Sequence, residues 1–195
     1  LQDTMALLQS RPALARAQLL RAAGRQFIEG DVQHWWLPQT GRGVRTLVSD
    51  DRFWLGYCAA HYISVTADAA VLDETLPFLD GPALPEGEAD NFFLPTITAE
   101  SATVFEHCAR ALDGGLALGP HGLPLIGSGD WNDGMSSIGI EGQGESIWLG
   151  WFQHYVLTQF APLAQARGEP ARAARWLAHA EAFLFPSAVG RLADC

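Results

Sequence analysis

The segment 145–166 constrains the fold of this chain more than any other part of the sequence. Its apolar side chains lie on nearly every side of a helix rather than along one stripe. The residues that form this pattern are Ile147, Trp148, Trp151, Phe152, Tyr155 and Leu157. A helix that is apolar nearly all round is typical of a position inside a globular protein. The sequence therefore predicts a buried inner helix.

Other segments also have the spacing of helices, and none forms a convincing series of strands. We expect helices at 13–27, 52–66, 69–78 and 169–182, and one more that starts at Thr98 or Ser101. Long loops are expected between them, over 31–51 and over 80–95. The sequence therefore predicts an all-α protein with six or seven helices.

The composition indicates a globular chain and excludes several classes of partner. Hydrophobic residues make up 48% of the 195 positions, enough for one domain with a core. The net charge of −10, without a basic cluster, argues against nucleic acid and anionic membrane surfaces. No apolar run approaches the roughly 20 residues of a spanning helix, and no signal peptide is visible. Cys58, Cys108 and Cys195 form no paired motif, so we interpret them as buried or terminal thiols in a reducing compartment.

Residues 127–134 read Gly-Ser-Gly-Asp-Trp-Asn-Asp-Gly and have the chemistry of a carbohydrate site. A carboxylic acid can protonate a leaving oxygen, a tryptophan face can stack on a sugar ring, and Asn132 can bind hydroxyls. Asp130 and Asp133 are both candidates for the acid, and the pattern does not choose between them. The alternative is a turn of Asp, Asn and Gly that caps a helix and holds a packed Trp131.

The loop 31–51 contains a second group of residues suited to sugars. Trp35 and Trp36 are adjacent, and long ordered loops in compact domains are usually functional. Arg45 and Asp51 offer a donor and an acceptor for neighbouring hydroxyls. The alternative is an Arg–Asp ion pair that ties the loop down. Two such loops in one small chain favour a binding site.

Other kinds of site find little support. Gly41-Arg-Gly43 and Gly127-Ser-Gly129 do not complete a nucleotide-binding motif. A calcium loop that begins at Asp130 would have Gly134 where an oxygen ligand is needed. The histidines lack zinc spacing, and Ser128 lacks the surroundings of an esterase nucleophile. We therefore expect no metal and no cofactor.

Three long segments resemble the glycoside hydrolase family 94 phosphorylases. They read EGDVQHWWLPQTGRGVRTLVSDDRFWL, VLDETLPFLDGPAL and HGLPLIGSGDWNDGMSSIGIEGQGESIWLGWF. Within that family they are most similar to the phosphorylase-like C-terminal region of cyclic β-1,2-glucan synthases. The resemblance runs from about residue 17 to about residue 182. It implies part of an (α/α)6 barrel over 1–182, followed by a tail over 183–195 that departs from the family.

The resemblance also implies a reaction, which is inverting phosphorolysis of a β-glucan that releases α-glucose 1-phosphate. Asp133 matches the general acid of the family, and Trp131 matches a residue that lines its glucose subsite at the cleavage point. Arg45 and Asp51 match its sugar-binding pair, so the loops 45–51 and 129–134 are expected to meet on one cleft. We assign Asp130, Trp35 and Trp36 to substrate binding as well. One acid is enough, because inorganic phosphate is the co-substrate and needs no base to activate it.

The chain also departs from the family in ways that bear on function. Leu37 and Leu47 stand where the family commonly has His and Arg. The family's phosphate-binding residues follow the matched region, so we expect part of a catalytic domain, with a non-catalytic glucan-binding or inactive fragment as the alternative. A β-glucan oligosaccharide is the expected partner, beside self-association or the rest of a parent polypeptide. We expect no membrane contact by this region, on the cytoplasmic face of a bacterial inner-membrane protein.

Overall fold

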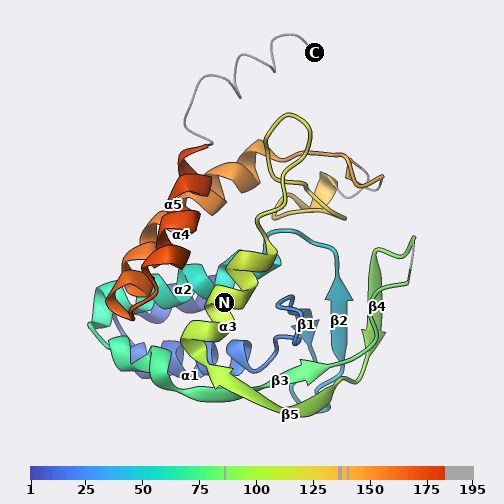
Figure 1. Ribbon diagram of the computed structural model, residues 1–195. Helices are drawn as coiled ribbons and strands as arrows, with labels where there is room; N and C mark the ends of the chain where they lie inside the picture. Colours follow the sequence, from blue (N-terminus) through green and yellow to red (C-terminus); the bar gives the residue numbers. More distant parts are fainter. Residues whose placement is uncertain (86, 136–137, 140, 183–195) are drawn as a thin grey trace. The chain divides into compact units, whose positions relative to one another are not determined.

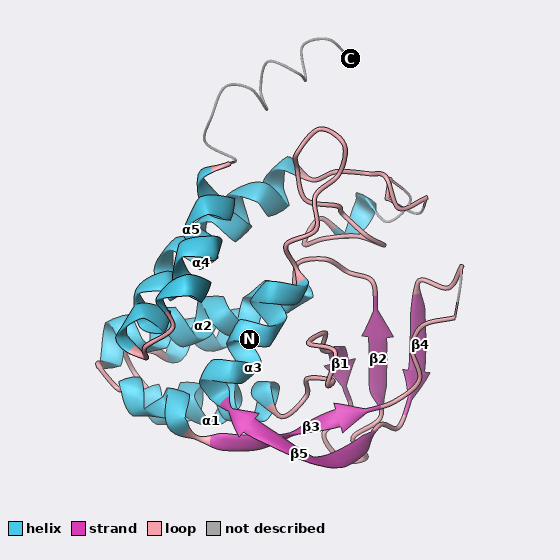
Figure 2. Cartoon of the chain, in the orientation of Figure 1, coloured by secondary structure: helices cyan, strands magenta, loops and turns pink. Residues whose placement is uncertain are grey.

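The computed structural model describes residues 1–85, 87–135, 138–139 and 141–182. The tail predicted at 183–195 lies outside these residues. The described chain mixes helices with strands, as Figure 2 shows. It divides into two compact units. Unit 1 comprises Leu1–Leu47 and Asp51–Gly115, and unit 2 comprises Val48–Asp50 and Leu116–Cys195.

Unit 1 has a helical core. Its helices are η1 (Gln2–Leu7), α1 (Pro12–Ala23), α2 (Asp51–Thr66), η2 (Ala69–Asp73) and α3 (Val104–Gly114). The helices α1, α2 and α3 pack against one another. Their contact surface consists of fully buried side chains such as Leu19, Phe53 and Leu112. Burial of this apolar surface is the main stabilising contribution to the unit.

Two antiparallel sheets complete unit 1. In the first, β2 (Gly43–Thr46) lies between β1 (Gln33–Trp36) and β4 (Asp90–Phe93), as Figure 1 shows. In the second, β3 (Thr75–Asp80) pairs with β5 (Thr96–Thr103), and β5 contacts α3. The β1–β2 hairpin requires glycine at position 43, since a Cβ atom there would collide with the carbonyl oxygen of Trp35.

The prediction of an all-α fold is wrong. The partial (α/α)6 barrel implied by the resemblance stays untested. Five strands occur among the described residues, in the segments expected to be loops or helices. The helix expected at 69–78 is the short η2 followed by strand β3, and the segment from Thr98 is strand β5. Helix α3 begins only at Val104, where the Thr103 hydroxyl accepts a hydrogen bond from the Glu106 N–H at 3.2 Å.

These strands have no periodic apolar pattern. Strand β5 is exposed or half-buried along its whole length, so its side chains do not alternate between a core face and a solvent face. Strand β2 pairs with β4, which lies more than 40 positions later in the chain. Pairing over such a distance is stabilised by tertiary contacts that no local window of sequence contains.

Unit 2 contains the helix predicted from its apolar pattern. Helix α4 (Ile147–Ala166) packs along α5 (Pro170–Glu181), and η3 (Asp133–Met135) is a single short turn. The rings of Phe160 and Trp176 meet edge to face at 5.8 Å, and both are fully buried. The prediction of a buried inner helix is wrong for part of α4, because Trp151 is 59% exposed. The helices expected at 52–66, 145–166 and 169–182 are confirmed to within two residues.

Two further observations concern thiols and membranes. Cys58 and Cys108 are buried free thiols, and Cys195 lies outside the described residues. Burial raises the pKa of Cys58 to about 12 and also raises the pKa of Cys108. Both groups therefore stay protonated near neutral pH. Among the described residues, no helix combines the length and hydropathy needed to cross a membrane.

Candidate functional site

The loop that carries the Asp-Trp-Asn-Asp motif is attached at its base to the start of helix α4. The Ile126 N–H donates to the carbonyl of Gly144 at 2.8 Å, and the Ser146 N–H donates to that of Pro124 at 2.9 Å. Gly127 then takes a left-handed conformation with φ of 62°. Glycine is the residue that adopts this conformation without strain, so the motif's first glycine lets the chain turn into the loop.

Asp130 points into the protein and is only 3% exposed. Its Oδ1 accepts hydrogen bonds from the backbone N–H of Asn132 at 2.8 Å and from the Asn132 side-chain amide at 2.9 Å. Its Oδ2 accepts the hydroxyl of Ser146 at 2.6 Å. This is the turn geometry that Asp and Asn favour, so the turn offered as the alternative interpretation is present. Both carboxylate oxygens are therefore engaged within the protein.

Trp131, by contrast, faces outward from the turn and is 52% exposed. Its ring lies beside that of Trp148, with centroids 6.0 Å apart and planes 22° apart. The ring of Trp148 in turn stacks on that of Phe152 at 5.3 Å. Stacking in this manner restricts the Trp131 ring while leaving part of its surface accessible. A sugar ring is one ligand that such an aromatic surface suits.

Asp133 is the first residue of η3. The chain reaches it directly after Asn132, whose backbone N–H is bound to Asp130 and whose carbonyl accepts the Met135 N–H at 2.9 Å. The side chain of Asp133 lies outside what the structure describes. Its role as general acid therefore stays a prediction.

The upstream motif reaches unit 2 through residues Val48–Asp50. Val48 forms β-bridges with Gly127 and Gly129. The Ser49 N–H and hydroxyl both donate to the carbonyl of Gly129, at 2.9 and 3.1 Å. Segments 80 positions apart in the sequence are thus joined at the motif loop. Arg45 and Asp51 belong to unit 1, and the meeting of Asp51 with Asp133 on one cleft stays a prediction.

The two tryptophans of the upstream motif lie on strand β1. Trp35 is 47% exposed and its ring is 5.5 Å from that of Phe92 on β4. Trp36 is half-buried, and the guanidinium of Arg25 lies 5.5 Å from its ring centroid. Both side chains therefore have aromatic or cationic neighbours that orient their rings. Their contact with a substrate stays a prediction.

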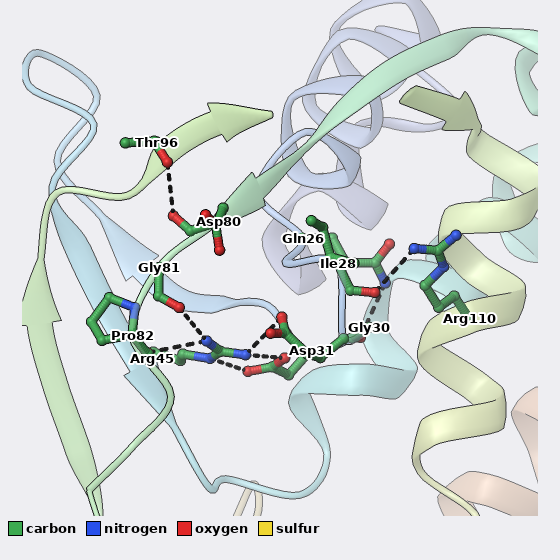
Figure 3. A network of polar contacts seen from close by, with 11 residues as sticks. Gln26, Ile28, Gly30, Asp31, Arg45, Asp80, Gly81, Pro82, Thr96 and Arg110 are labelled. Carbon is green, nitrogen blue, oxygen red and sulfur yellow. Dashed lines mark hydrogen bonds and ion pairs between the residues drawn. The ribbon is translucent and has the colours of Figure 1, made fainter. Parts of the chain in front are cut away.

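Arg45 is buried at the centre of a polar network, shown in Figure 3. Its guanidinium forms a two-pronged pair with Asp31, at 2.6 and 2.8 Å, and a third bond to Glu29 at 3.1 Å. Its remaining nitrogen donates to the carbonyls of Gly81 and Pro82, at 3.2 and 3.1 Å. All five N–H donors of the guanidinium are thus engaged.

This network has an electrostatic consequence and a structural one. Burial on its own would lower the pKa of Arg45, but the hydrogen bond and charge of Asp31 and the charge of Glu29 outweigh it and raise that pKa. The ion pair anticipated for this loop exists, with Asp31 as the partner in place of Asp51. Arg45 thereby ties strand β2 to the segments 29–31 and 81–82. A sugar hydroxyl that binds Arg45 directly must replace one of these acceptors.

Asp51 has two partners that the sequence did not reveal. Its carboxylate lies 2.9 Å from Nδ1 of His34 on strand β1, and it accepts the hydroxyl of Thr46 at 3.1 Å. Asp51 is also the first residue of helix α2, where a negative charge is favourable. The only signal in the sequence was the position of His34 beside the two tryptophans.

Among the described residues, no group of three or more His, Cys, Asp or Glu side chains is arranged to hold a metal ion.

Comparison with known proteins identifies the family. The glycosyl hydrolase 94 superfamily catalytic domain matches residues 1–186. The chain is 56% identical over 185 residues to cyclic beta-(1,2)-glucan synthase NdvB of Rhizobium meliloti (strain 1021), covering 93% of this chain and 6% of that protein. It is 31% identical to solabiose phosphorylase of Paenibacillus borealis, covering 85% of the chain and 19% of that enzyme.

A third relative is the cellobionic acid phosphorylase of Neurospora crassa, 29% identical over 93% of the chain and 21% of that enzyme. The chain thus spans only a small part of the length of each of these relatives. Since the family match covers nearly all of its residues, the chain belongs to the glycosyl hydrolase 94 superfamily and corresponds to part of the catalytic domain.

Proposed function

We propose that this chain contributes the general acid and part of the sugar site of an inverting glycoside phosphorylase that acts on β-1,2-glucan. The observation that carries the proposal is the family match together with 56% identity to a cyclic glucan synthase. The relatives that are named phosphorylases support phosphate as the co-substrate. No other cofactor is needed for this chemistry.

In the proposed reaction, an oxygen of inorganic phosphate attacks C1 of the terminal glucose from the face opposite the β-linked oxygen. The bond between C1 and that oxygen breaks as the new C1–O bond forms. Asp133 gives its proton to the departing oxygen, so the products are α-glucose 1-phosphate and a glucan shorter by one unit. General acid catalysis of this kind contributes about 10²–10⁴-fold to a rate.

In this proposal the two motif carboxylates have different parts, and the surroundings of Asp130 support the division. Asp130 accepts hydrogen bonds on both oxygens and is buried, which leaves it poorly placed to reach a substrate. Asp133 begins η3, directly after Asn132 and two residues after the exposed Trp131. We therefore assign the acid to Asp133, sugar stacking to Trp131, and hydroxyl recognition to Asp51. For Trp35, Trp36 and Arg45 of unit 1, glucan binding is likewise a proposal.

The proposal is tested with Asp133→Asn in the protein that contains this chain. We expect release of glucose 1-phosphate from β-1,2-glucan and phosphate to fall by about 10²-fold or more, because the amide cannot supply the proton. Glucan binding, measured by calorimetry, should be largely retained. Asp3→Asn, at an exposed position in η1, is the matched control. Activity that survives in Asp133→Asn would reassign the acid.

The stereochemistry and the co-substrate are tested separately. Proton NMR of the early product should show the α anomer of glucose 1-phosphate, and the β anomer would exclude inversion. Cleavage that proceeds equally well without phosphate would identify a hydrolase.

We further propose that the parent protein resides in a bacterial inner membrane with this region on the cytoplasmic face, which protease protection in spheroplasts can test.

A further inference from the structure

A buried hydrogen bond joins the motif loop to the first turn of helix α4. The Ser146 hydroxyl donates to Oδ2 of Asp130 at 2.6 Å, and these side chains belong to residues 6% and 3% exposed. A hydroxyl that donates to a carboxylate at this distance forms one of the stronger hydrogen bonds in proteins. A buried carboxylate that loses such a donor carries an uncompensated desolvation cost. The pair is therefore a strong constraint on the loop.

The same hydroxyl also starts the helix. Ser146 is the N-cap of α4, and its oxygen accepts the Leu149 N–H at 3.0 Å. A hydroxyl has one hydrogen to donate and two lone pairs to accept with, so both bonds form together. The backbone of Ser146 is bound as well, through its N–H to the carbonyl of Pro124. The position of the Ser146 side chain is thus set by the helix and by the base of the loop.

The other oxygen of Asp130 determines the path of the loop. Oδ1 accepts both the backbone N–H and the side-chain amide of Asn132. This closes a tight turn in which Trp131 is the residue directed outward, beside Trp148 of helix α4. Asp133 follows immediately, at the start of η3. The turn therefore sets the direction of the Trp131 side chain and the path of the backbone into Asp133.

We propose that Asp130 and Ser146 are positioning residues, and that the hydrogen bond between them holds Trp131 and Asp133 in the orientation needed to act on a glucan. Ser146 lies 16 positions from Asp130 and outside the motif. The inference rests on the proposed function for the identity of the substrate. A misplacement of reacting groups by about 1 Å can cost about 10²-fold in rate, so loss of this bond should be visible in turnover.

The variants are chosen to separate this bond from the capping of the helix. Ser146→Gly removes the donor, while glycine is itself a favoured N-cap residue and keeps most of the stability that serine gives the helix. Ser146→Thr retains the hydroxyl and should restore both functions. Thr103→Gly is the matched control, because the Thr103 hydroxyl caps α3 through Glu106 and serves no motif loop. Asp130→Ala and its double variant with Ser146→Gly complete a mutant cycle.

Two measurements on the protein that contains this chain test the proposal. Hydrogen exchange should show the Asn132 amide exchanging about tenfold faster or more in Ser146→Gly, and unchanged in Ser146→Thr and Thr103→Gly. The kcat for phosphorolysis should fall about tenfold or more in Ser146→Gly, whereas KM should change by a smaller factor. The double variant should lose no more than Asp130→Ala alone, because both substitutions break the same contact.

The outcomes test the role of the Ser146–Asp130 bond separately from the proposed function. Unchanged Asn132 exchange in Ser146→Gly would overturn the inference, as would faster exchange with unchanged kcat. Losses that add in the double variant would overturn it too, since the residues would then act separately. If Ser146→Gly fails to fold, Asp130→Ala and Ser146→Thr still test whether faster exchange of the Asn132 amide accompanies a lower kcat. A parent protein that forms no glucose 1-phosphate from glucan would refute the proposed function, and the exchange data would still decide whether the bond holds the loop.

Discussion

The Nδ1 atom of His34 lies 2.9 Å from both carboxylate oxygens of Asp51. The histidine stands on strand β1 and the carboxylate begins helix α2, 17 positions later. Thr46, on strand β2, donates its hydroxyl to the same carboxylate. Three elements of unit 1 therefore meet at the residue that we assign to sugar recognition, and the direction in which Asp51 presents its oxygens depends on them.

We predict that His34→Ala weakens β-1,2-glucan binding about tenfold, because a hydrogen bond to a charged group contributes about 1.5–3 kcal/mol. His34→Asn should recover part of the affinity, since its amide can donate from a similar position. Isothermal titration of short β-1,2-glucans measures both. His61→Ala, a half-buried histidine of helix α2, is the control and should bind normally. Equal affinity of the parent and His34→Ala would show that Asp51 does not need this partner.

Trp131→Ala should lower the affinity for the same glucans by about tenfold, since an aromatic face is among the strongest contacts available to a neutral sugar. Trp151→Ala is the matched control, because Trp151 is exposed to a similar degree and lies on helix α4. Circular dichroism checks that both variants fold. An unchanged affinity in folded Trp131→Ala would show that the ring serves only to pack against Trp148.

Arg45→Ala should destabilise unit 1 by about 3–5 kcal/mol, the usual cost of removing one partner from a buried charge pair. Arg45→Lys should be destabilising as well, because an ammonium cannot replace five donors in a planar fork. Urea denaturation gives the free energy of unfolding. Arg21→Ala removes an exposed arginine of helix α1 and should change it by about 0.5 kcal/mol or less. A stable Arg45→Ala variant that loses only glucan affinity would favour direct sugar contact.

A buried histidine makes the stability of unit 1 depend on pH. Burial lowers the pKa of His107, whose ring is fully buried, stacks on Phe78 at 4.0 Å and places Nε2 3.0 Å from the carbonyl of Leu76. Within the part of the chain that the structure describes, Nδ1 has no hydrogen-bond partner, as expected for a neutral ring that donates from Nε2. The unfolded chain therefore binds a proton at a higher pH than the native one.

The sign of the effect follows from this difference in proton uptake. The stability contributed by neutral His107 is complete above the unfolded pKa of about 6.5 and decreases as the pH falls through that value toward the lower native pKa. We expect urea unfolding midpoints to fall between pH 7 and pH 5, and to fall less in His107→Gln. Burial also lowers the pKa of His179 in unit 2, which adds a contribution of the same sign. A pH profile unchanged by His107→Gln would assign the effect to other groups.

The sequence alone identified the helices whose pattern is local. The apolar residues at successive turns indicate α4, the helical spacing of 52–66 indicates α2, and the Arg- and Ala-rich composition after Pro170 indicates α5. The same reading missed strands β1, β2 and β4, since pairing of residues 43–46 with 90–93 depends on contacts between distant segments. Trp35 and Trp36 were assigned to a loop because four-residue strands are too short to show alternation.

The sequence alone also indicates the family, because the motif segments resemble glycoside hydrolase family 94 and the family match agrees. Binding of a sugar by these motifs stays a prediction. What the sequence left open was which donors and acceptors satisfy one another. Arg45 pairs with Asp31, which the sequence pattern does not single out, and Asp51 is held by His34. Asp130 is held by Ser146, a residue that the sequence pattern does not single out. Only the tertiary structure decided these pairs, because a buried charge binds whichever partner the folded backbone brings within about 3 Å, and distance along the chain does not determine that partner.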